Sequence, residues 1–171
     1  MFDLITAVTI VASDLGGTAI GNAMMIDLDK SAEIRGVDEN KNGLRDDFEK
    51  MLINKVKDDK ERNMLYHMLT YMDKAIEFGS TKSVDQKEEA LEIFKTYELN
   101  KVFQCVSRGG QSLYTFIDKK FPSTKERKKA YVTFNNAFAK NKYKVEKGMV
   151  NCDVFYSGIP NYTETEFKNL N

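Results

Sequence analysis

The sequence is poor in the residues from which zinc sites and many catalytic sites are built. Its 171 residues include one histidine, two cysteines and no tryptophan. The cysteines form no C-x-x-C pair and no Cys/His cluster, which excludes the common zinc motifs. The only histidine, His67, lies in the apolar stretch MLYHMLTYM, so we expect a hydrogen-bonded helical residue rather than a catalyst.

The chain also lacks an excess of one charge and a run long enough to cross a membrane. It carries 26 basic and 26 acidic residues, so no overall field favours nucleic acid. The apolar run Leu4–Ala12 has nine residues, fewer than a bilayer span needs. It is similar to the middle of a signal peptide, but no Lys or Arg precedes it. We predict no membrane insertion, and a short strand or buried helical turn at this run.

The charges are unevenly distributed along the chain. Residues 118–148 carry a net charge of +7, and residues 1–117 a net charge of −5. Lysines interleaved with aromatic residues suit a nucleic-acid or anionic-lipid surface. However, Tyr131, Phe134 and Phe138 have core-facing helical spacing, which favours a helix with solvated lysines. We therefore expect no nucleic-acid partner.

Hydrophobic periodicity predicts a mainly α protein, with residues 1–171 forming one domain. We expect a bundle of four to five helices, an irregular N-terminal region and a tethered C-terminal tail from Lys142 onward. Capping patterns and helix-breaking Gly and Pro residues predict where each helix starts and ends. The predicted helices start near Asp46, at the cap Asp58 (ending at Gly79), at Ser83 (running past Cys105 to Gly109–Gly110), at Ser112 (ending before Pro122) and at the cap Ser123.

The two cysteines, Cys105 and Cys152, allow two interpretations. In an oxidising compartment they would form a disulfide that ties the tail to the core. Such a loop closure is worth roughly 4 kcal/mol in the chain-entropy model. Alternatively, they are two unrelated buried thiols.

One short stretch, Asp38–Glu49 (DENKNGLRDDFE), has the pattern of a calcium-binding loop. Ca²⁺ takes six to eight oxygen ligands, and a twelve-residue EF-hand loop supplies them from positions 1, 3, 5, 7, 9 and 12. Position 6 is Gly43, where the loop turns sharply. The sequence therefore predicts a Ca²⁺ site whose ligands are Asp38, Asn40, Asn42, the backbone carbonyl of Leu44, Asp46 and Glu49.

The alternative is a polar turn that leads into a helix, since Asp and Asn favour both turns and helix starts. A turn does not need a glycine and a glutamate at these two positions, so we favour the metal site. Arg45 occupies position 8, where paired EF-hands usually carry a branched aliphatic residue, and no second loop occurs. The pattern thus indicates a solitary structural site rather than a paired sensor.

The segment GVDENKNGLRDDFEKML resembles one in small, mostly uncharacterised exported proteins of Gram-negative bacteria. Those proteins carry G-x-D-x-N-x-N-G-x-R-D-D-x-E near the mature N-terminus. The resemblance covers about 17 residues. It implies a helical protein with a cysteine pair further along, and no enzymatic activity.

These observations lead to one functional hypothesis and two alternatives. We expect a non-enzymatic calcium-binding protein, periplasmic or secreted, that acts through contacts with an unknown protein partner. The first alternative is an inhibitor or immunity-type protein that binds an enzyme, with the ion incidental. The second is an enzyme with a cleft built from helix carboxylates.

Overall fold

The computed structural model describes residues 27–109, 111–143 and 150–158. The predicted element at Leu4–Ala12 lies outside these ranges. Within them the chain forms seven helices and no strand, which confirms a mainly α protein. The helices are α3 (Asp46–Lys55), α4 (Asp59–Thr81), α5 (Lys87–Thr96), α6 (Leu99–Gly109), α7 (Gln111–Lys120), α8 (Lys125–Ala139) and α9 (Cys152–Gly158).

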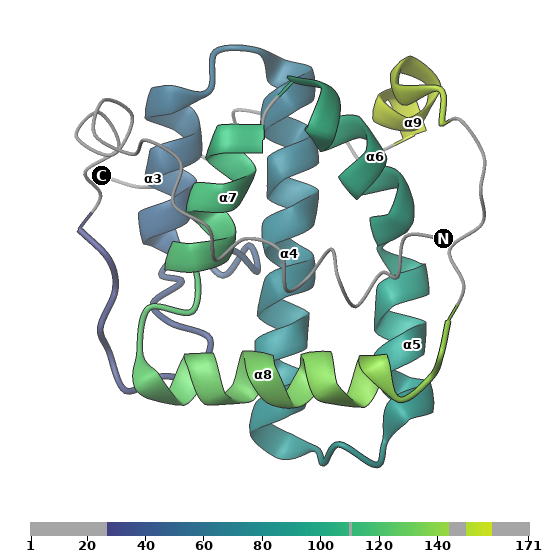
Figure 1. Ribbon diagram of the computed structural model, residues 1–171. Helices are drawn as coiled ribbons and strands as arrows, with labels where there is room; N and C mark the ends of the chain where they lie inside the picture. The colour runs from purple at the N-terminus through teal and green to yellow at the C-terminus, as the bar shows by residue number, and fades with distance from the viewer. Residues whose placement is uncertain (1–26, 110, 144–149, 159–171) are drawn as a thin grey trace.

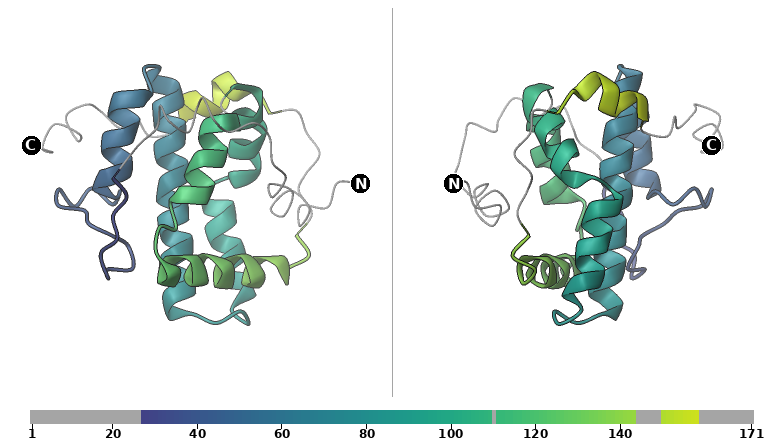
Figure 2. Two further views of the ribbon diagram at one scale, coloured as in Figure 1. Left: turned by 60° about the vertical axis from the view of Figure 1, so that its left-hand side comes forward. Right: turned by 90° about the vertical axis from the view of Figure 1, so that its right-hand side faces the viewer.

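Helix α4 is the centre of this arrangement (Figure 1). Helices α3, α5, α6, α8 and α9 all pack against it, and α8 crosses it near its C-terminal end (Figures 1 and 2). Because neighbours cover it on several sides, α4 buries apolar side chains on more than one face. The fully buried ones are Leu65, Met68, Leu69, Met72, Ala75 and Ile76.

Gly79 has a different role from the predicted one. We expected it to end the helix, but α4 continues to Thr81. A Cβ atom at position 79 would overlap the backbone carbonyl of Ala130 on α8. The missing side chain therefore allows α8 to cross directly against the α4 backbone.

The prediction of one long helix from Ser83 past Cys105 is wrong. The chain leaves helical geometry after α5 and resumes it in α6, with Glu98 in the left-handed region at φ 46°. The Nε2–H of His67 donates a hydrogen bond to the carbonyl of Tyr97 at 3.0 Å. His67 is therefore a hydrogen-bonded helical residue, as predicted, and it gives a partner to a carbonyl at the break.

The predicted capping residues are confirmed in part. The Asp58 carboxylate accepts a hydrogen bond from the amide three residues later, as an N-cap should. The last predicted helix is capped by Thr124 rather than Ser123, because Ser123 turns its hydroxyl towards another segment. The Ser83 hydroxyl accepts a hydrogen bond within its own turn, and the helix begins only at Lys87.

The C-terminal region is more regular than predicted. We expected an irregular tail, but residues 152–158 form α9, which contacts α4 and α6. Cys105 and Cys152 form a disulfide with a Cα–Cα distance of 5.5 Å, so the paired interpretation is confirmed. Phe155 is buried on the core, and both contacts hold α9 in place.

The close crossing at Gly79 gives a stability prediction. The Gly79→Ala variant should lower the free energy of unfolding by about 1–3 kcal/mol, because its Cβ atom forces α4 and α8 apart. Gly158→Ala is the matched control, since a Cβ atom there meets nothing within 4 Å. Urea unfolding of both variants measures the difference, and equal midpoints would contradict the role given to Gly79.

The disulfide gives a second prediction. Reduction should lower the free energy of unfolding by up to roughly 4 kcal/mol, because the reduced unfolded chain gains conformational freedom. Denaturant unfolding with and without reductant tests this. The Cys105→Ser/Cys152→Ser double variant is the control, and reductant should not change its unfolding. Unfolding curves of the parent that coincide under both conditions would refute the prediction.

Candidate metal centre

The predicted loop follows a segment without regular secondary structure. Residues 27–45 form neither helix nor strand, and α3 begins at Asp46, which is position 9 of the loop. Two residues of the loop take left-handed backbone conformations, Lys41 at φ 57° and Gly43 at φ 89°. A non-glycine residue rarely adopts this region, so the surrounding contacts hold Lys41 there. These two turns fold residues 38–43 back towards the start of α3.

Glu49 is the side chain around which the loop closes. It lies one turn into α3 and is fully buried, with 0% of its surface exposed. The Asn40 side-chain amide donates to its Oε2 at 3.1 Å, and the Asn42 side-chain amide donates to its Oε1. Three of the predicted ligands, from positions 3, 5 and 12, therefore meet at one point. An Asn side chain carries an oxygen beside its amide nitrogen, so rotation of either amide would present an oxygen to a cation there.

Asp38 and Asp46 bind loop amides. The Asp38 carboxylate accepts hydrogen bonds from the amides of Asn42 at 3.2 Å and Gly43 at 2.9 Å. The Asp46 carboxylate accepts a longer bond of 3.3 Å from the amide of Glu39. Both residues thus stabilise the fold of the loop. The side chain of Leu44 is fully buried in the core, which fixes the backbone at position 7.

The loop places several carboxylates close together, two of them, Asp46 and Glu49, buried from solvent. Burial raises the pKa of Glu49; the bonds from Asn42 and Asn40 oppose this rise, and the charges of Asp46 and Asp38 add to it. Burial also raises the pKa of Asp46. Carboxylates that repel one another in this way are the chemistry that a divalent cation neutralises. The donor set of carboxylate and amide oxygens suits Ca²⁺, a hard cation.

The carboxylates alone do not make a metal cluster. In the ranges given above, no three or more His, Cys, Asp or Glu side chains are grouped so as to hold a metal ion. The predicted site depends on Asn40, Asn42 and a backbone carbonyl as well as on three acids. The convergence at Glu49 fits the predicted ligand set, and calcium binding itself stays a prediction.

Two contacts fix the loop on the helices. The Tyr66 hydroxyl on α4 donates to the backbone carbonyl of Asn42 at 3.1 Å. Arg45, at position 8, is buried, and its guanidinium lies 4.8 Å and 4.9 Å from the ring centres of Phe48 and Phe121. In place of the aliphatic residue of a paired EF-hand, this loop uses a cation–π contact with its own core.

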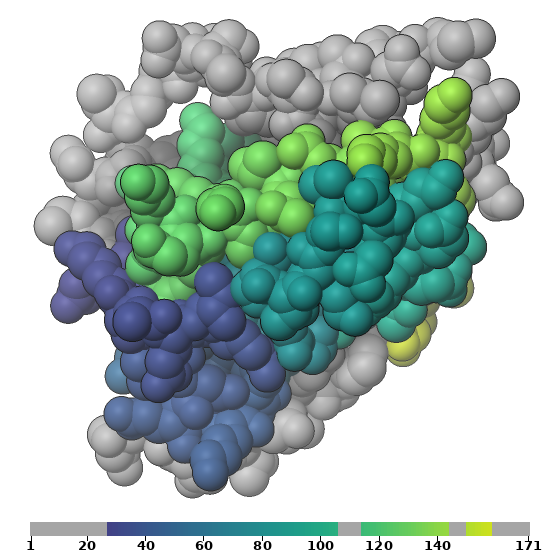
Figure 3. Space-filling model, turned by 90° about the horizontal axis from the view of Figure 1, so that it is seen from below, coloured from purple at the N-terminus to yellow at the C-terminus, as the bar shows by residue number. Residues whose placement is uncertain are grey.

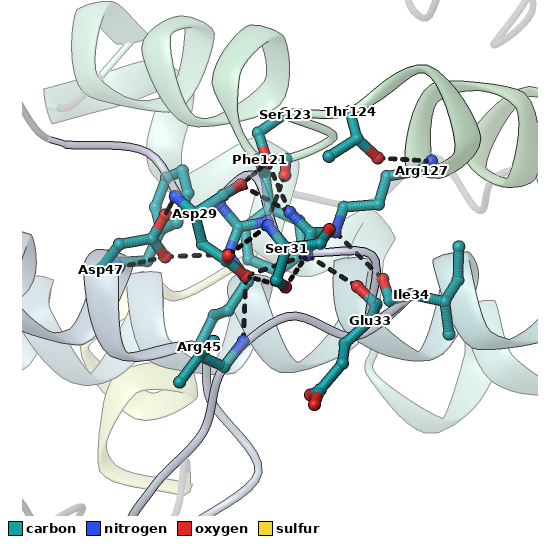
Figure 4. Close-up of polar contacts among 12 residues, drawn as sticks. Asp29, Ser31, Glu33, Ile34, Arg45, Asp47, Phe121, Ser123, Thr124 and Arg127 are labelled. Carbon is teal, nitrogen blue, oxygen red and sulfur yellow. Dashed lines mark hydrogen bonds and ion pairs between the residues drawn. The ribbon is translucent and has the colours of Figure 1, made fainter.

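The segment before the loop is held by Arg127, a residue that we did not single out from the sequence (Figure 4). Its guanidinium is fully buried on α8. It donates to the backbone carbonyls of Asp29 at 2.7 Å, Glu33 at 2.7 Å and Ile34 at 3.2 Å. It also pairs with the Asp29 carboxylate at 2.9 Å. One side chain from the last third of the chain thus fixes residues 29–34.

The contacts of Asp29 continue to α3 and to the loop itself. The amide of Asp29 donates to the Asp47 carboxylate at 2.8 Å. Asp47 also pairs with Arg45, at 2.7 Å, and Arg45 donates to the carbonyl of Phe121 at 2.6 Å. We call Asp29, Arg45, Asp47 and Arg127 the anchor cluster (Figure 4). It joins both ends of the predicted metal loop to α3, α8 and the turn between α7 and α8.

Other groups that could do chemistry have structural partners. Asp118 on α7 accepts a hydrogen bond from the Tyr131 hydroxyl at 3.2 Å, and burial raises the pKa of Asp118. Glu88 and Glu92 on α5 are exposed and each pairs with a lysine. None of these contacts brings a nucleophile next to a general base.

Comparisons of the chain with protein-family models, with curated proteins and with solved structures found no match. None of the helices in the described part is long and apolar enough to cross a membrane.

The anchor cluster predicts an acid-dependent loss of stability. Burial alone would raise the pKa of Asp29, but bonds from the Ser31 and Val37 amides and the Ser31 hydroxyl, with the charge of Arg127, lower it to about 2. A lowered pKa means that the ionised Asp29, through these hydrogen bonds and its pairing with Arg127, stabilises the fold above the unfolded-state pKa of about 3.9. This contribution, about 2 kcal/mol, should be lost as the pH falls from about 4 to about 2.

The measurement is the free energy of unfolding between about pH 5 and about pH 2. The Asp29→Asn variant should be less stable than the parent at pH 5. Its free energy of unfolding should fall much less than that of the parent as the pH is lowered. Asp27→Asn, which changes an exposed carboxylate two residues earlier, should lose as much stability as the parent. The same pH slope in the parent and in Asp29→Asn would show that Asp29 is not the group responsible.

Proposed function

We propose that this is a non-enzymatic protein that binds one Ca²⁺ ion in the loop Asp38–Glu49. The observation that carries the proposal is the convergence of Asn40, Asn42 and Glu49, with Glu49 fully buried and both of its oxygens turned into the loop. A buried carboxylate that faces only two amides is costly unless its charge is neutralised. A bound cation supplies that neutralisation, and the left-handed turns at Lys41 and Gly43 support the folded loop.

We propose a structural role for the ion rather than a switch. In sensor pairs, an entering helix moves relative to the exiting one. Here residues 27–45 form no entering helix, and the anchor cluster holds them by buried ion pairs. Because both ends of the loop are fixed, Ca²⁺ binding can tighten the loop. It cannot open a helix pair, because no helix precedes the loop in residues 27–45.

The proposed affinity and location follow from the ligand chemistry. Three carboxylates and two neutral amides suit an affinity in the range of extracellular modules, about 10⁻⁴–10⁻³ M. Such a site fills only where calcium is in the millimolar range. The Cys105–Cys152 disulfide supports the same assignment, because disulfides persist in oxidising compartments. We therefore propose that the protein acts in the cell envelope or outside the cell, through contacts with another protein.

Thermal unfolding with and without calcium tests the proposal. Ca²⁺ at about 10 mM is about 10–100 times the proposed Kd and stabilises the fold by about 1.4–2.7 kcal/mol. It should therefore raise the Tm by roughly 3–10 °C over EDTA. Glu49→Gln should abolish this shift, because it removes the charged bidentate ligand while keeping the side-chain volume.

Glu39→Gln is the matched control, since it removes one exposed carboxylate at position 2 of the same loop. This variant should keep the full calcium shift. If calcium does not change the Tm of the parent, or if it stabilises Glu49→Gln equally, the loop is a polar turn and the proposal fails. If the calcium shift is found, isothermal titration with Ca²⁺ should give a stoichiometry of one ion per protein chain.

A further inference from the structure

Five exposed lysines lie around the turn that joins α7 to α8, and the calcium site does not explain them. Lys119 and Lys120 end α7, and Lys125, Lys128 and Lys129 lie in the first turns of α8. Between residues 119 and 129 the only acidic side chain is Glu126. We call these five lysines the basic surface. Helix α8, which carries three of them, lies at the surface of the molecule and is seen from below in Figure 3.

The lysines between residues 74 and 101 behave differently. Each of the five from Lys74 to Lys101 pairs with a glutamate close in sequence. In the described part of the chain, none of the five lysines of the basic surface has an ion-pair partner. The contrast indicates that residues 74–101 balance their own positive charges, while the start of α8 leaves its positive charge open to solvent.

The positions of Lys125 and Lys128 work against α8, whereas Lys119 and Lys120 lie in the last turn of α7, where the dipole favours them. The N-terminus of a helix is the positive end of its dipole, where acidic residues stabilise and lysines destabilise. Lys125 and Lys128, three apart, repel each other as well as the dipole. The helix dipole therefore gives no reason for lysine at these two sites of α8. A local departure of this kind is expected where a surface serves binding.

The composition of the surface favours a lipid membrane over a protein partner. Protein interfaces are enriched in arginine and depleted in lysine. The one arginine in this stretch, Arg127, is fully buried, so the exposed positive charges are all lysine. Lysine is a compact point charge without a bidentate geometry, which suits a diffuse layer of anionic headgroups. Val132, one turn further along the exposed side of α8, is 55% exposed and can contact the interfacial region.

We propose that the basic surface binds the protein peripherally to membranes that contain anionic lipid. The contact is electrostatic, with Lys125, Lys128 and Lys129 against headgroup phosphates and Val132 at the boundary with the acyl chains. None of the described helices crosses the bilayer in this arrangement. It goes beyond the proposed calcium function and needs no metal, so it should persist in EDTA.

The test is co-sedimentation of the full chain with vesicles in EDTA. The protein should bind vesicles of mixed phosphatidylglycerol and phosphatidylcholine and should not bind pure phosphatidylcholine. Binding should be strong at about 0.1 M salt and lost near 1 M, where the Debye length falls from about 10 Å to about 3 Å. The triple variant Lys125→Gln/Lys128→Gln/Lys129→Gln should lower the partition coefficient about 100-fold.

The matched control is Lys55→Gln/Lys57→Gln/Lys60→Gln, which removes the same charge from three exposed lysines at the α3–α4 junction. It should keep most of the binding, and both variants should unfold cooperatively with a Tm near that of the parent. Equal losses in the two variants would mean that net charge alone drives binding and would overturn the proposal. Failure to bind the anionic vesicles, or equally tight binding of duplex DNA, would overturn it as well.

Discussion

The buried guanidinium of Arg127 is the interaction on which the candidate site depends. A guanidinium taken out of water needs nearly all of its donors satisfied, because an unpaired buried charge is far costlier than a paired one. Arg127 finds its partners in four backbone carbonyls, one carboxylate and one hydroxyl of residues 29–34. That segment has no secondary structure of its own to satisfy these groups. The backbone carbonyls therefore satisfy the guanidinium, and the guanidinium satisfies the carbonyls. The segment that leads into the predicted metal loop is thus fixed by α8, almost a hundred residues later in the chain.

The network explains how a loop without an entering helix keeps its shape. Asp29 connects Arg127 to Asp47, and Asp47 connects to Arg45 inside the loop, so that one chain of contacts runs from α8 to α3. Arg45 then reaches the carbonyl of Phe121 and lies near two aromatic rings. In a paired EF-hand the second loop holds the first. Here the same need is met by buried arginines, which explains why the aliphatic residue of position 8 can be replaced.

Structural features that depend on neighbouring residues were predictable from the sequence. Features that depend on contacts between distant residues were less so. The helical class and the Asp58 cap followed from periodicity and capping patterns, and the disulfide was one of two interpretations of the cysteines. The break at Glu98 did not, because no glycine or proline marks it and a hydrogen bond from His67 on another helix supports it. Arg127 left a signal that we did not use. It lies three and seven residues before Ala130 and Phe134, on the buried stripe of α8. A charged residue at a core position predicts a buried partner, although the sequence does not say which.

The two proposals concern opposite uses of charge within one molecule. Around Glu49 the fold gathers acidic groups and buries them, an arrangement that a cation stabilises. At the start of α8 it gathers lysines and exposes them, against the preference of the helix dipole. Arg127 lies between the two regions, in the same helix as three of those lysines and bonded to the segment that leads into the loop. The two sites share no side chain, and none of the five lysines belongs to the anchor cluster that joins α8 to the loop, so we expect them to act independently. This is why calcium and vesicle binding are each expected to survive the loss of the other.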